Sequence, residues 1–217
     1  MSNETNMPRV LPRLNEPAPI FDALTTLGRK TLEDYRGQWL VLFSHPADFT
    51  PVCTTEFMGF GRRYSDFRAI GCELLGLSVD SQYSHVAWVR EIERKFEVEI
   101  GFPIIADRSM EVARAYGMIQ PGASDTSTVR ATFVIDPEGV LRAMFYYPME
   151  NGRSSGEILR LVKAMQTSDA FGVATPENWQ PGDQVIARPP ESLAEAAARM
   201  ADTEYDCVDW YFCRRPL

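Results

Sequence analysis

The segment that most constrains the fold runs from Trp39 to Phe57 and reads WLVLFSHPADFTPVCTTEF. Its first five residues are an unbroken apolar run of strand length, which is typical of a central strand covered on both faces of a parallel sheet. Pro46 and Pro51 prevent the strand from continuing. Because Thr50 suits a helix cap and Pro51 suits a first helical position, the sequence predicts a helix over residues 52–69.

Cys53 would then lie in the first turn of that helix. Unpaired backbone N–H groups and the positive end of the helix dipole favour a thiolate over a thiol there. A turn from strand to helix at the carboxyl edge of a sheet is also where open α/β folds place their sites. A buried structural cysteine is the alternative interpretation. The position of Cys53 after Pro46 and Thr50 favours a nucleophile instead.

These residues resemble a known family. Pro46, Thr50 and Cys53 match the Pro-x-x-x-Thr-x-x-Cys signature of the peroxiredoxins, and residues 44–56 resemble the one-cysteine (type six) branch. The resemblance extends from about Pro17 to the end of the chain. It implies an α/β, thioredoxin-like fold with a mixed sheet flanked by helices. It also implies a thiol-dependent peroxidase that reduces hydrogen peroxide and organic hydroperoxides.

Composition limits the other classes of function. The 217 residues carry a net charge of −8 without a Lys/Arg-rich run among aromatics, so we expect neither nucleic acid nor a membrane as a partner. Residues 1–15 lack the apolar core of a signal peptide, and we expect a cytoplasmic protein. Four cysteines without zinc-finger spacing and only two histidines make a metal site improbable, and we expect no cofactor.

The remaining elements are predicted from hydrophobic periodicity and turn residues. We expect an edge strand or hairpin over 16–27, strands at 73–79, 102–106, 131–135 and 140–147, and helices at 81–96, 109–116, 155–166 and 193–202. The order is thioredoxin-like, with parallel and antiparallel strands in one sheet. Prolines become frequent after Asp169. We therefore assign residues 1–168 to a peroxidase domain and 169–217 to an extended C-terminal dimerisation arm.

Two arginines are expected at the site. Arg130 opens a predicted strand, and an arginine at a strand end can reach a nucleophile at another strand end. The resemblance places the family's active-site arginine at Arg130 and a second one at Arg153. With Thr50, Arg130 would hold the thiolate and the peroxide, while Pro46 would shield the sulfur from bulk water. His45 and Glu56 are expected to support substrate binding.

Attack on peroxide would leave Cys53 as a sulfenic acid, which a nearby thiol can convert to a disulfide. Cys207 and Cys213 depart from the one-cysteine pattern and resemble those of microbial members whose tail cysteine crosses to the neighbouring subunit. Spacing does not decide which of them attacks Cys53. We favour Cys213, with Cys207 exchanging with Cys213 on the way to a thioredoxin-like or other thiol reductant. Cys72 is expected to be structural.

The tail also suggests assembly. Residues 205–213 read YDCVDWYFC, with more aromatic surface than a detached strip can bury, so a partner subunit is expected to cover it. We expect a dimer with exchanged arms, and the resemblance implies a ring of five dimers. The alternative function is a peroxide-responsive chaperone or sensor that uses the same cysteine.

Overall fold

The computed structural model describes residues 11–217. The chain divides into two compact units, one that ends at Ser155 and one from Gly156 to Leu217, and each is described by itself. The boundary predicted between residues 168 and 169 falls inside helix α4 (Ser155–Phe171) and stays a prediction. The N-terminal segment in which we expect no signal peptide lies mostly outside the described residues.

A seven-stranded mixed sheet forms the centre of the first unit. Its strands are β1 (Asp22–Thr25), β2 (Gly28–Thr31), β3 (Trp39–Ser44), β4 (Cys72–Ser78), β5 (Ile104–Ala106), β6 (Arg130–Ile135) and β7 (Leu141–Tyr147). They are ordered β2-β1-β5-β4-β3-β6-β7. β3 and β5 pair parallel with β4, whereas the other neighbours are antiparallel. This arrangement confirms the predicted mixed α/β sheet. β1 lies within residues 16–27, where an edge strand or hairpin was expected, but its hairpin partner β2 lies beyond that segment.

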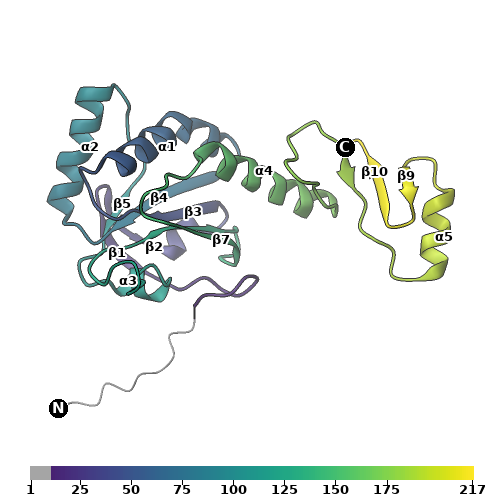
Figure 1. The fold of residues 1–217 in the computed structure, drawn as a ribbon, viewed down its shortest axis with the longest axis horizontal. Helices are drawn as coiled ribbons and strands as arrows, with labels where there is room; N and C mark the ends of the chain where they lie inside the picture. The colour runs from purple at the N-terminus through teal and green to yellow at the C-terminus, as the bar shows by residue number, and fades with distance from the viewer. Residues whose placement is uncertain (1–10) are drawn as a thin grey trace, which may run out of the picture. The chain divides into compact units, whose positions relative to one another are not determined.

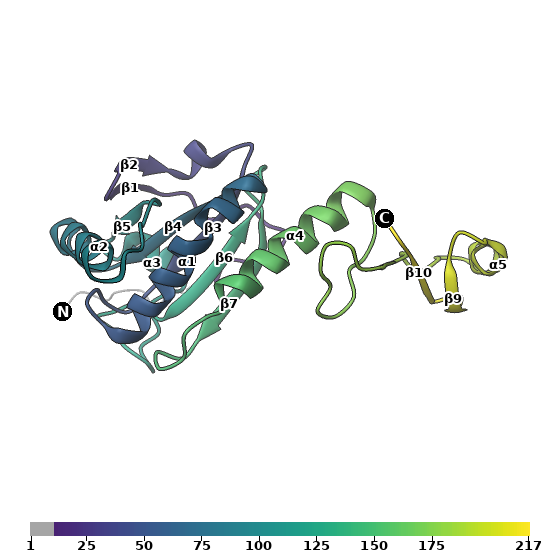
Figure 2. The same cartoon turned by 90° about the horizontal axis from the view of Figure 1, so that it is seen from above.

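Helices cover both faces of this sheet. They are α1 (Pro51–Ala69), α2 (Gln82–Phe96) and α3 (Glu111–Ala115), with a short 3₁₀ helix η1 (Leu32–Tyr35). Figure 1 shows α1 and α2 on one face and α3 on the other, and in Figure 2 α1 crosses the middle of the sheet. The ends of these elements differ from the predicted ones by one or two residues. α4 continues to Phe171 instead of ending at 166.

Alternation along β3 explains why both faces need a cover. All six residues of β3 are buried. Phe43 faces α1, where its ring stacks on Phe60 with centroids 4.2 Å apart. Leu40 and Leu42 point to the opposite face and join the core cluster that includes Tyr116, just after α3. Successive side chains of a strand point to opposite faces, so a wholly apolar strand requires apolar layers on both.

The sheet brings the predicted site residues to one edge. β3 ends at Ser44, and the chain then turns into α1. Because β6 is antiparallel to β3, with Thr132 opposite Phe43, the first residue of β6 lies at the edge where β3 ends. That residue is Arg130. The start of α1 and the start of β6 therefore meet, although they are distant in sequence.

The second unit contains more regular structure than an extended arm. Its elements after α4 are β8 (Val185–Ile186), α5 (Leu193–Ala201), β9 (Asp206–Asp209) and β10 (Phe212–Arg215), with sheet order β8-β10-β9. Trp179 is buried in a small cluster with Ala164, Val173 and Val185. The helix was predicted, but the three-stranded sheet was not, because strands of two to four residues carry too short a pattern to detect.

A disulfide joins Cys207 to Cys213 across the paired strands β9 and β10. The two residues are direct register partners in this hairpin. Within residues 11–217, no helix combines the length and the apolar composition that a membrane crossing requires.

Candidate active site

Cys53 lies in the first turn of α1, as predicted. Its side chain is a free thiol and is fully buried in the protomer. The first helical hydrogen bond runs from the Thr54 amide to the Thr50 carbonyl, 3.0 Å away. Amides earlier in the turn lack such carbonyl partners, and they give the helix start its partial positive charge.

Arg130 contacts the sulfur directly. Its Nη1 lies 3.3 Å from Cys53 Sγ, within hydrogen-bonding range for sulfur. The guanidinium is held in place because its Nε donates to the Met149 carbonyl at 2.8 Å and Nη1 also donates to Glu56 Oε2 at 2.6 Å. Arg130 is buried as well, so a fixed positive charge faces the sulfur away from solvent.

Glu56 links two buried arginines. Arg153 binds it through Nε, 2.8 Å from Oε1, and through Nη2, 2.9 Å from Oε2, while the Arg153 amide donates to Oε1 at 2.7 Å. Burial alone would raise the pKa of Glu56, but the hydrogen bonds and charge of Arg153, with the charge of Arg130, lower it below the usual value. Glu56 is therefore ionised near neutral pH.

The charges of this group favour an anion at the sulfur. Arg130 and Arg153 carry two positive charges, and Glu56 supplies one negative charge. Uncompensated buried charge is costly, and a thiolate on Cys53 would balance it. The structure thus brings Cys53, Arg130, Glu56 and Arg153 together. Glu56 contacts the arginines and not the sulfur, so it acts as a support for them.

The Glu56→Ala variant should be strongly destabilised, because it leaves two arginines buried without their carboxylate. We expect a loss of about 3–5 kcal/mol in the free energy of unfolding, measured by urea denaturation of the reduced protein. Since the folded pKa of Glu56 is lowered, its contribution is complete above the unfolded pKa of about 4.3 and is lost as pH falls through the folded pKa.

Glu91→Ala is the control for that experiment, because Glu91 pairs with Arg94 and Lys95 on the surface of α2. Exposed pairs contribute little, so its unfolding curve should nearly match that of the wild type. Equal stability of Glu56→Ala and Glu91→Ala would contradict the support role of Glu56.

Thr50 differs from its expected role as a side-chain cap. It occupies the position before α1, but its hydroxyl makes no capping hydrogen bond and instead donates to the Ala47 carbonyl at 2.9 Å. The one hydroxyl proton is thus used within the loop, which leaves the oxygen lone pairs as acceptors. Pro46 lies in the same loop and is half-buried, while the sulfur that it is expected to shield is fully buried.

His45 belongs to a buried group that sequence analysis did not assemble. Its Nε2 lies 2.9 Å from Asp48 Oδ1, and His85 Nδ1 lies 2.8 Å from Asp48 Oδ2. Among residues 11–217, these three side chains are the set that could hold a metal ion, because one nitrogen or oxygen atom of each lies within 4.8 Å of the other two. The measured separations are hydrogen-bond lengths between nitrogen and oxygen, and the expectation that no metal binds stays a prediction. Neither Asp48 nor His85 was assigned a role, because no local pattern marks their contact.

The other three cysteines belong to other elements of the chain. Cys72 is buried at the start of β4, and burial raises the pKa of its thiol, which fits a structural residue. Cys207 and Cys213 lie in the second unit and are bonded to each other, so neither is a free thiol in this structure.

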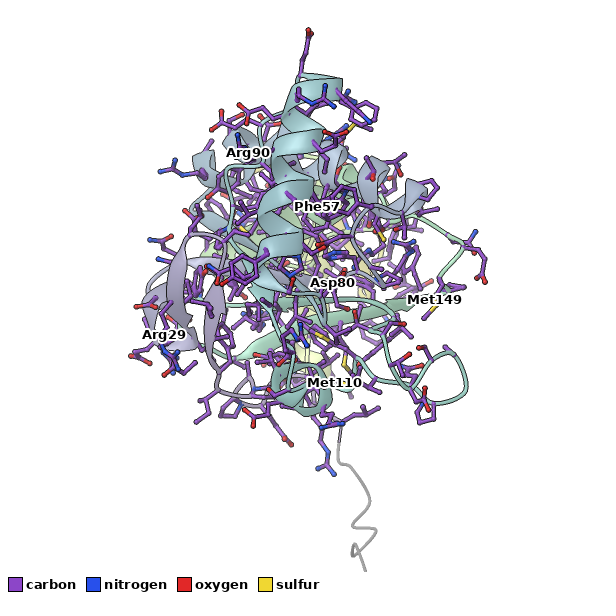
Figure 3. The ribbon with its side chains drawn as sticks, turned by 90° about the vertical axis from the view of Figure 1, so that its left-hand side faces the viewer. Arg29, Phe57, Asp80, Arg90, Met110 and Met149 are labelled. Atoms are coloured by element: carbon purple, nitrogen blue, oxygen red, sulfur yellow. A yellow bond between two sulfur atoms is a disulfide. The ribbon has the colours of Figure 1, made fainter. Side chains whose placement is uncertain are left out.

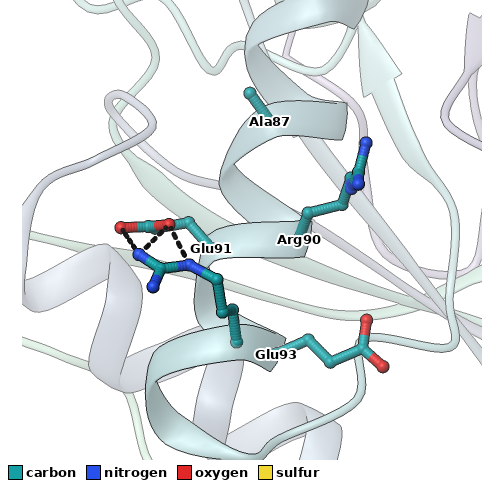
Figure 4. A pocket seen from close by; sticks show the side chains of 5 residues that line it. Ala87, Arg90, Glu91 and Glu93 are labelled. Atoms are coloured by element: carbon teal, nitrogen blue, oxygen red, sulfur yellow. Dashed lines mark hydrogen bonds and ion pairs between the residues drawn. The ribbon is translucent and has the colours of Figure 1, made fainter.

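Besides a hollow near the start of α2 that is lined by Gln82, Tyr83, Val86, Ala87 and Arg90, two surface hollows lie on the α2 side of the first unit. One, of about 490 Å³, is lined by Ala87, Arg90, Glu91, Glu93 and Arg94, and Arg94 Nη2 donates to Glu91 Oε2 at 2.8 Å. Figure 4 shows Ala87, Arg90, Glu91 and Glu93 along this face of α2. The other, of about 390 Å³, is lined by residues of α1 and α2 that include Thr50, Thr54 and Trp88. Of these two hollows, the second borders the turn that carries Cys53.

The fold and the site define a class: a thioredoxin-like protein with a cysteine at a helix start beside a buried arginine. Comparison with known families agrees. Residues 14–144 match the AhpC/TSA family, and residues 164–203 match the C-terminal domain of 1-Cys peroxiredoxin. The chain belongs to the peroxiredoxins of the AhpC/TSA family, and it is a thiol peroxidase, an oxidoreductase.

Relatives in other organisms are similar over nearly the whole chain. A peroxiredoxin of Aquifex aeolicus is 55% identical, with 95% of this chain and 98% of the relative covered. One of Thermotoga maritima is 51% identical, with 95% and 98% covered.

Solved structures of peroxiredoxins are also similar to this chain over most of its length. The yeast mitochondrial 1-Cys peroxiredoxin has a TM-score of 0.84 and 40% identity, with 94% of this chain and 99% of that chain covered. A cysteine-to-serine mutant of the peroxiredoxin 6 of Arenicola marina has a TM-score of 0.83 and 36% identity, with 94% and 97% covered.

Proposed function

We propose that this chain reduces hydrogen peroxide and organic hydroperoxides with Cys53 as the attacking residue, and that Cys213 of a partner subunit resolves the oxidised cysteine. The observation that carries the proposal is the 3.3 Å contact between Cys53 Sγ and Arg130 Nη1, two buried side chains. A thiolate is the reactive form of cysteine, and a fixed guanidinium stabilises it in that form.

The first step breaks the O–O bond of the peroxide. The Cys53 thiolate attacks one oxygen and becomes a sulfenic acid, while the other oxygen leaves with the electron pair and takes a proton to form water or an alcohol. Arg130 can donate a hydrogen bond to the developing negative charge on the leaving oxygen. Thr50, Pro46, His45, Glu56 and Arg153 are proposed to bind, shield or support this centre.

The second step forms disulfides. The Cys213 thiolate of the partner attacks the Cys53 sulfenic acid, water leaves, and the two sulfurs are joined. Cys207 then attacks Cys213 and releases Cys53 as a thiol, which leaves the bond between Cys207 and Cys213. The presence of that bond within one chain supports this order, because it is the expected last oxidised state.

A thiol reductant would then reopen the Cys207–Cys213 bond. The related structure of yeast mitochondrial 1-Cys peroxiredoxin concerns thiol resolution through the glutathione and thioredoxin systems. By analogy, we propose a thioredoxin-like or other small thiol donor for this chain. No further cofactor is needed for the sequence of steps.

The proposed resolving step requires a second subunit. Apolar side chains near the C-terminus are exposed in the protomer, including Val208, Trp210 and Tyr211. Surface of this kind is typical of an interface. We propose a dimer with two-fold symmetry, in which every contact occurs twice, and five such dimers in a ring. A cytoplasmic location is part of the same proposal.

Peroxide treatment should therefore trap a covalent dimer when the exchange with Cys207 is blocked. We expect Cys207→Ser to run as a dimer on a non-reducing denaturing gel after one equivalent of peroxide, and to return to monomer with dithiothreitol. Cys213→Ser should give no such dimer, and with excess peroxide its Cys53 sulfenic acid should be oxidised further to the sulfinic acid, which intact mass spectrometry would detect. A dimer in Cys213→Ser would contradict the assignment of Cys213.

A further inference from the structure

Asp48, His45 and His85 form a closed hydrogen-bonded group beside the turn that carries Cys53. All three side chains are buried. They come from different parts of the fold: His45 and Asp48 lie between β3 and α1, whereas His85 lies in the first turns of α2. The group therefore ties the loop before Cys53 to a neighbouring helix.

The hydrogen positions follow from the partners. His85 Nε2 faces the Ile105 carbonyl at 3.1 Å, so this nitrogen must carry a hydrogen. Its Nδ1 faces the Asp48 carboxyl group, with 2.8 Å to Oδ2 and 3.0 Å to Oδ1. Burial alone would raise the pKa of Asp48, but the hydrogen bonds from His45 and His85 lower it far below the usual value. The Asp48 carboxylate is thus the shared hydrogen-bond acceptor of the two imidazole rings.

The state of His45 follows in the same way. Its Nε2 donates to Asp48 Oδ1 at 2.9 Å, and its Nδ1 has no hydrogen-bond partner in the described structure. Burial lowers the pKa of His45, so the ring is neutral with its hydrogen on Nε2. The ring packs between Phe57 and Trp88, with centroids 4.7 and 5.1 Å away. Within the described residues, Asp48 is the polar contact that orients this ring.

The backbone next to Asp48 needs such an anchor. Phe49 has a φ of 57°, in the left-handed region that is unfavourable for a residue other than glycine, and its side chain is exposed. The Asp48 amide donates to Asp80 Oδ2 at 2.8 Å. Figure 3 looks onto α2, with Asp80 just below the start of the helix and Phe57 behind it. Both the side chain and the amide of Asp48 thus fasten the loop to the region before and within α2.

We propose that Asp48 and His85 are positioning residues for the reaction of Cys53 with peroxide: their hydrogen bonds hold the strained loop from His45 to Thr50, and with it the first turn of α1. The inference rests on the proposed peroxidase function and adds two residues to its machinery. Their hydrogen bonds go to each other, to His45, to Asp80 and to Ile105, so their effect on Cys53 passes through the loop. Misplacement of reacting groups by about 1 Å can cost about 100-fold in rate.

The positions of the two carboxylate oxygens allow an isosteric test. In Asp48→Asn, an amide oxygen at the place of Oδ1 can accept from His45 Nε2, and an amide nitrogen at the place of Oδ2 can donate to His85 Nδ1. Both hydrogen bonds are retained without the charge. Asp48→Ala removes both. His85→Phe keeps an aromatic ring at this position and removes the hydrogen bonds to Asp48. This variant replaces Asp48→Ala in the test if Asp48→Ala does not fold.

The rate of peroxide reduction per Cys53 is measured by stopped flow, together with the rate of Cys53 alkylation by iodoacetamide under native conditions. We expect the rate of peroxide reduction to fall about 10- to 100-fold in Asp48→Ala and His85→Phe, because the reacting groups are no longer held in place. The rate of Cys53 alkylation should rise in both variants, because the loop no longer encloses the sulfur. Asp48→Asn should stay within about threefold of the wild type in both, since the hydrogen bonds that orient the loop remain. Asp136→Ala is the control, a buried aspartate in the turn after β6 at the opposite end of the sheet. It should lower the melting temperature without changing either rate.

A ¹⁵N spectrum of histidine-labelled protein provides a readout that does not depend on activity, and the chain has only two histidines. We expect His85 to carry a hydrogen on Nε2, which faces the Ile105 carbonyl, and His45 to carry its hydrogen on Nε2, which faces Asp48. A His45 ring protonated on Nδ1 alone would overturn the proposal, as would wild-type rates in folded Asp48→Ala or His85→Phe, or an Asp48→Asn rate as low as that of Asp48→Ala. A wild-type protein without peroxide turnover would instead refute the proposed function.

Discussion

The Cys53→Ser variant is expected to lose peroxide turnover. Serine at this position keeps the size and the burial of the side chain, but its hydroxyl does not ionise near neutral pH, and no nucleophile remains beside Arg130. Removal of a catalytic nucleophile can lower turnover about a million-fold, so activity should fall below detection. The measurement is steady-state consumption of hydrogen peroxide with thioredoxin or dithiothreitol as the reductant.

Cys72→Ser is the matched control, because Cys72 is the other free cysteine of the chain and is also buried. It should keep nearly wild-type turnover if it folds. Substantial activity in Cys53→Ser would contradict the mechanism. The same assay separates the enzyme from a peroxide-responsive chaperone or sensor, since neither of those requires repeated turnover by the wild type.

The Arg130→Met variant should show the second-largest effect. Methionine preserves much of the length and packing but removes the charge that lies 3.3 Å from Cys53 Sγ. Loss of one oriented donor at a reacting centre typically costs about 100- to 1,000-fold, and we expect a loss of that size in the rate of Cys53 oxidation by peroxide. The pH profile of Cys53 alkylation should also move to higher pH, because the thiolate loses its cation.

Arg142→Met tests whether this effect is specific to the site. Arg142 is a partly buried arginine, paired with Asp136 at 3.2 Å, on β7 near the opposite end of the sheet. Its replacement should leave both the oxidation rate and the alkylation profile unchanged. An alkylation profile that is the same in Arg130→Met and the wild type would refute the role of Arg130.

Several parts of the fold could be predicted because their causes are local. The apolar run of β3 and the prolines after it placed a buried strand, a turn and the start of α1, and with them Cys53 in the first helical turn. Arg130 was found at the start of a strand for the same reason. Periodicity and turn residues act over a few positions, so a single sequence contains them in full.

Other parts depended on contacts between distant residues. Asp48 and His85 are 37 positions apart, and their hydrogen bond exists only because α2 packs beside the loop before Cys53. The pairing of Glu56 with Arg153 spans 97 positions and required β6 to run antiparallel to β3. The hydroxyl of Thr50 donates to the Ala47 carbonyl in the loop instead of capping α1. The presence of a threonine at this position does not distinguish between these two hydrogen bonds.

The sequence by itself thus predicted the cysteine that we propose as the nucleophile, the helix that carries it and the arginine expected beside it, since the residue types and spacings that specify them are continuous along the chain. Only the tertiary structure decided how that arginine is held and charged, and how the loop before the nucleophile is fastened. Those features rest on side chains whose separation in space is set by strand order and helix packing, and a hydrogen bond between them tolerates errors of only a few tenths of an ångström.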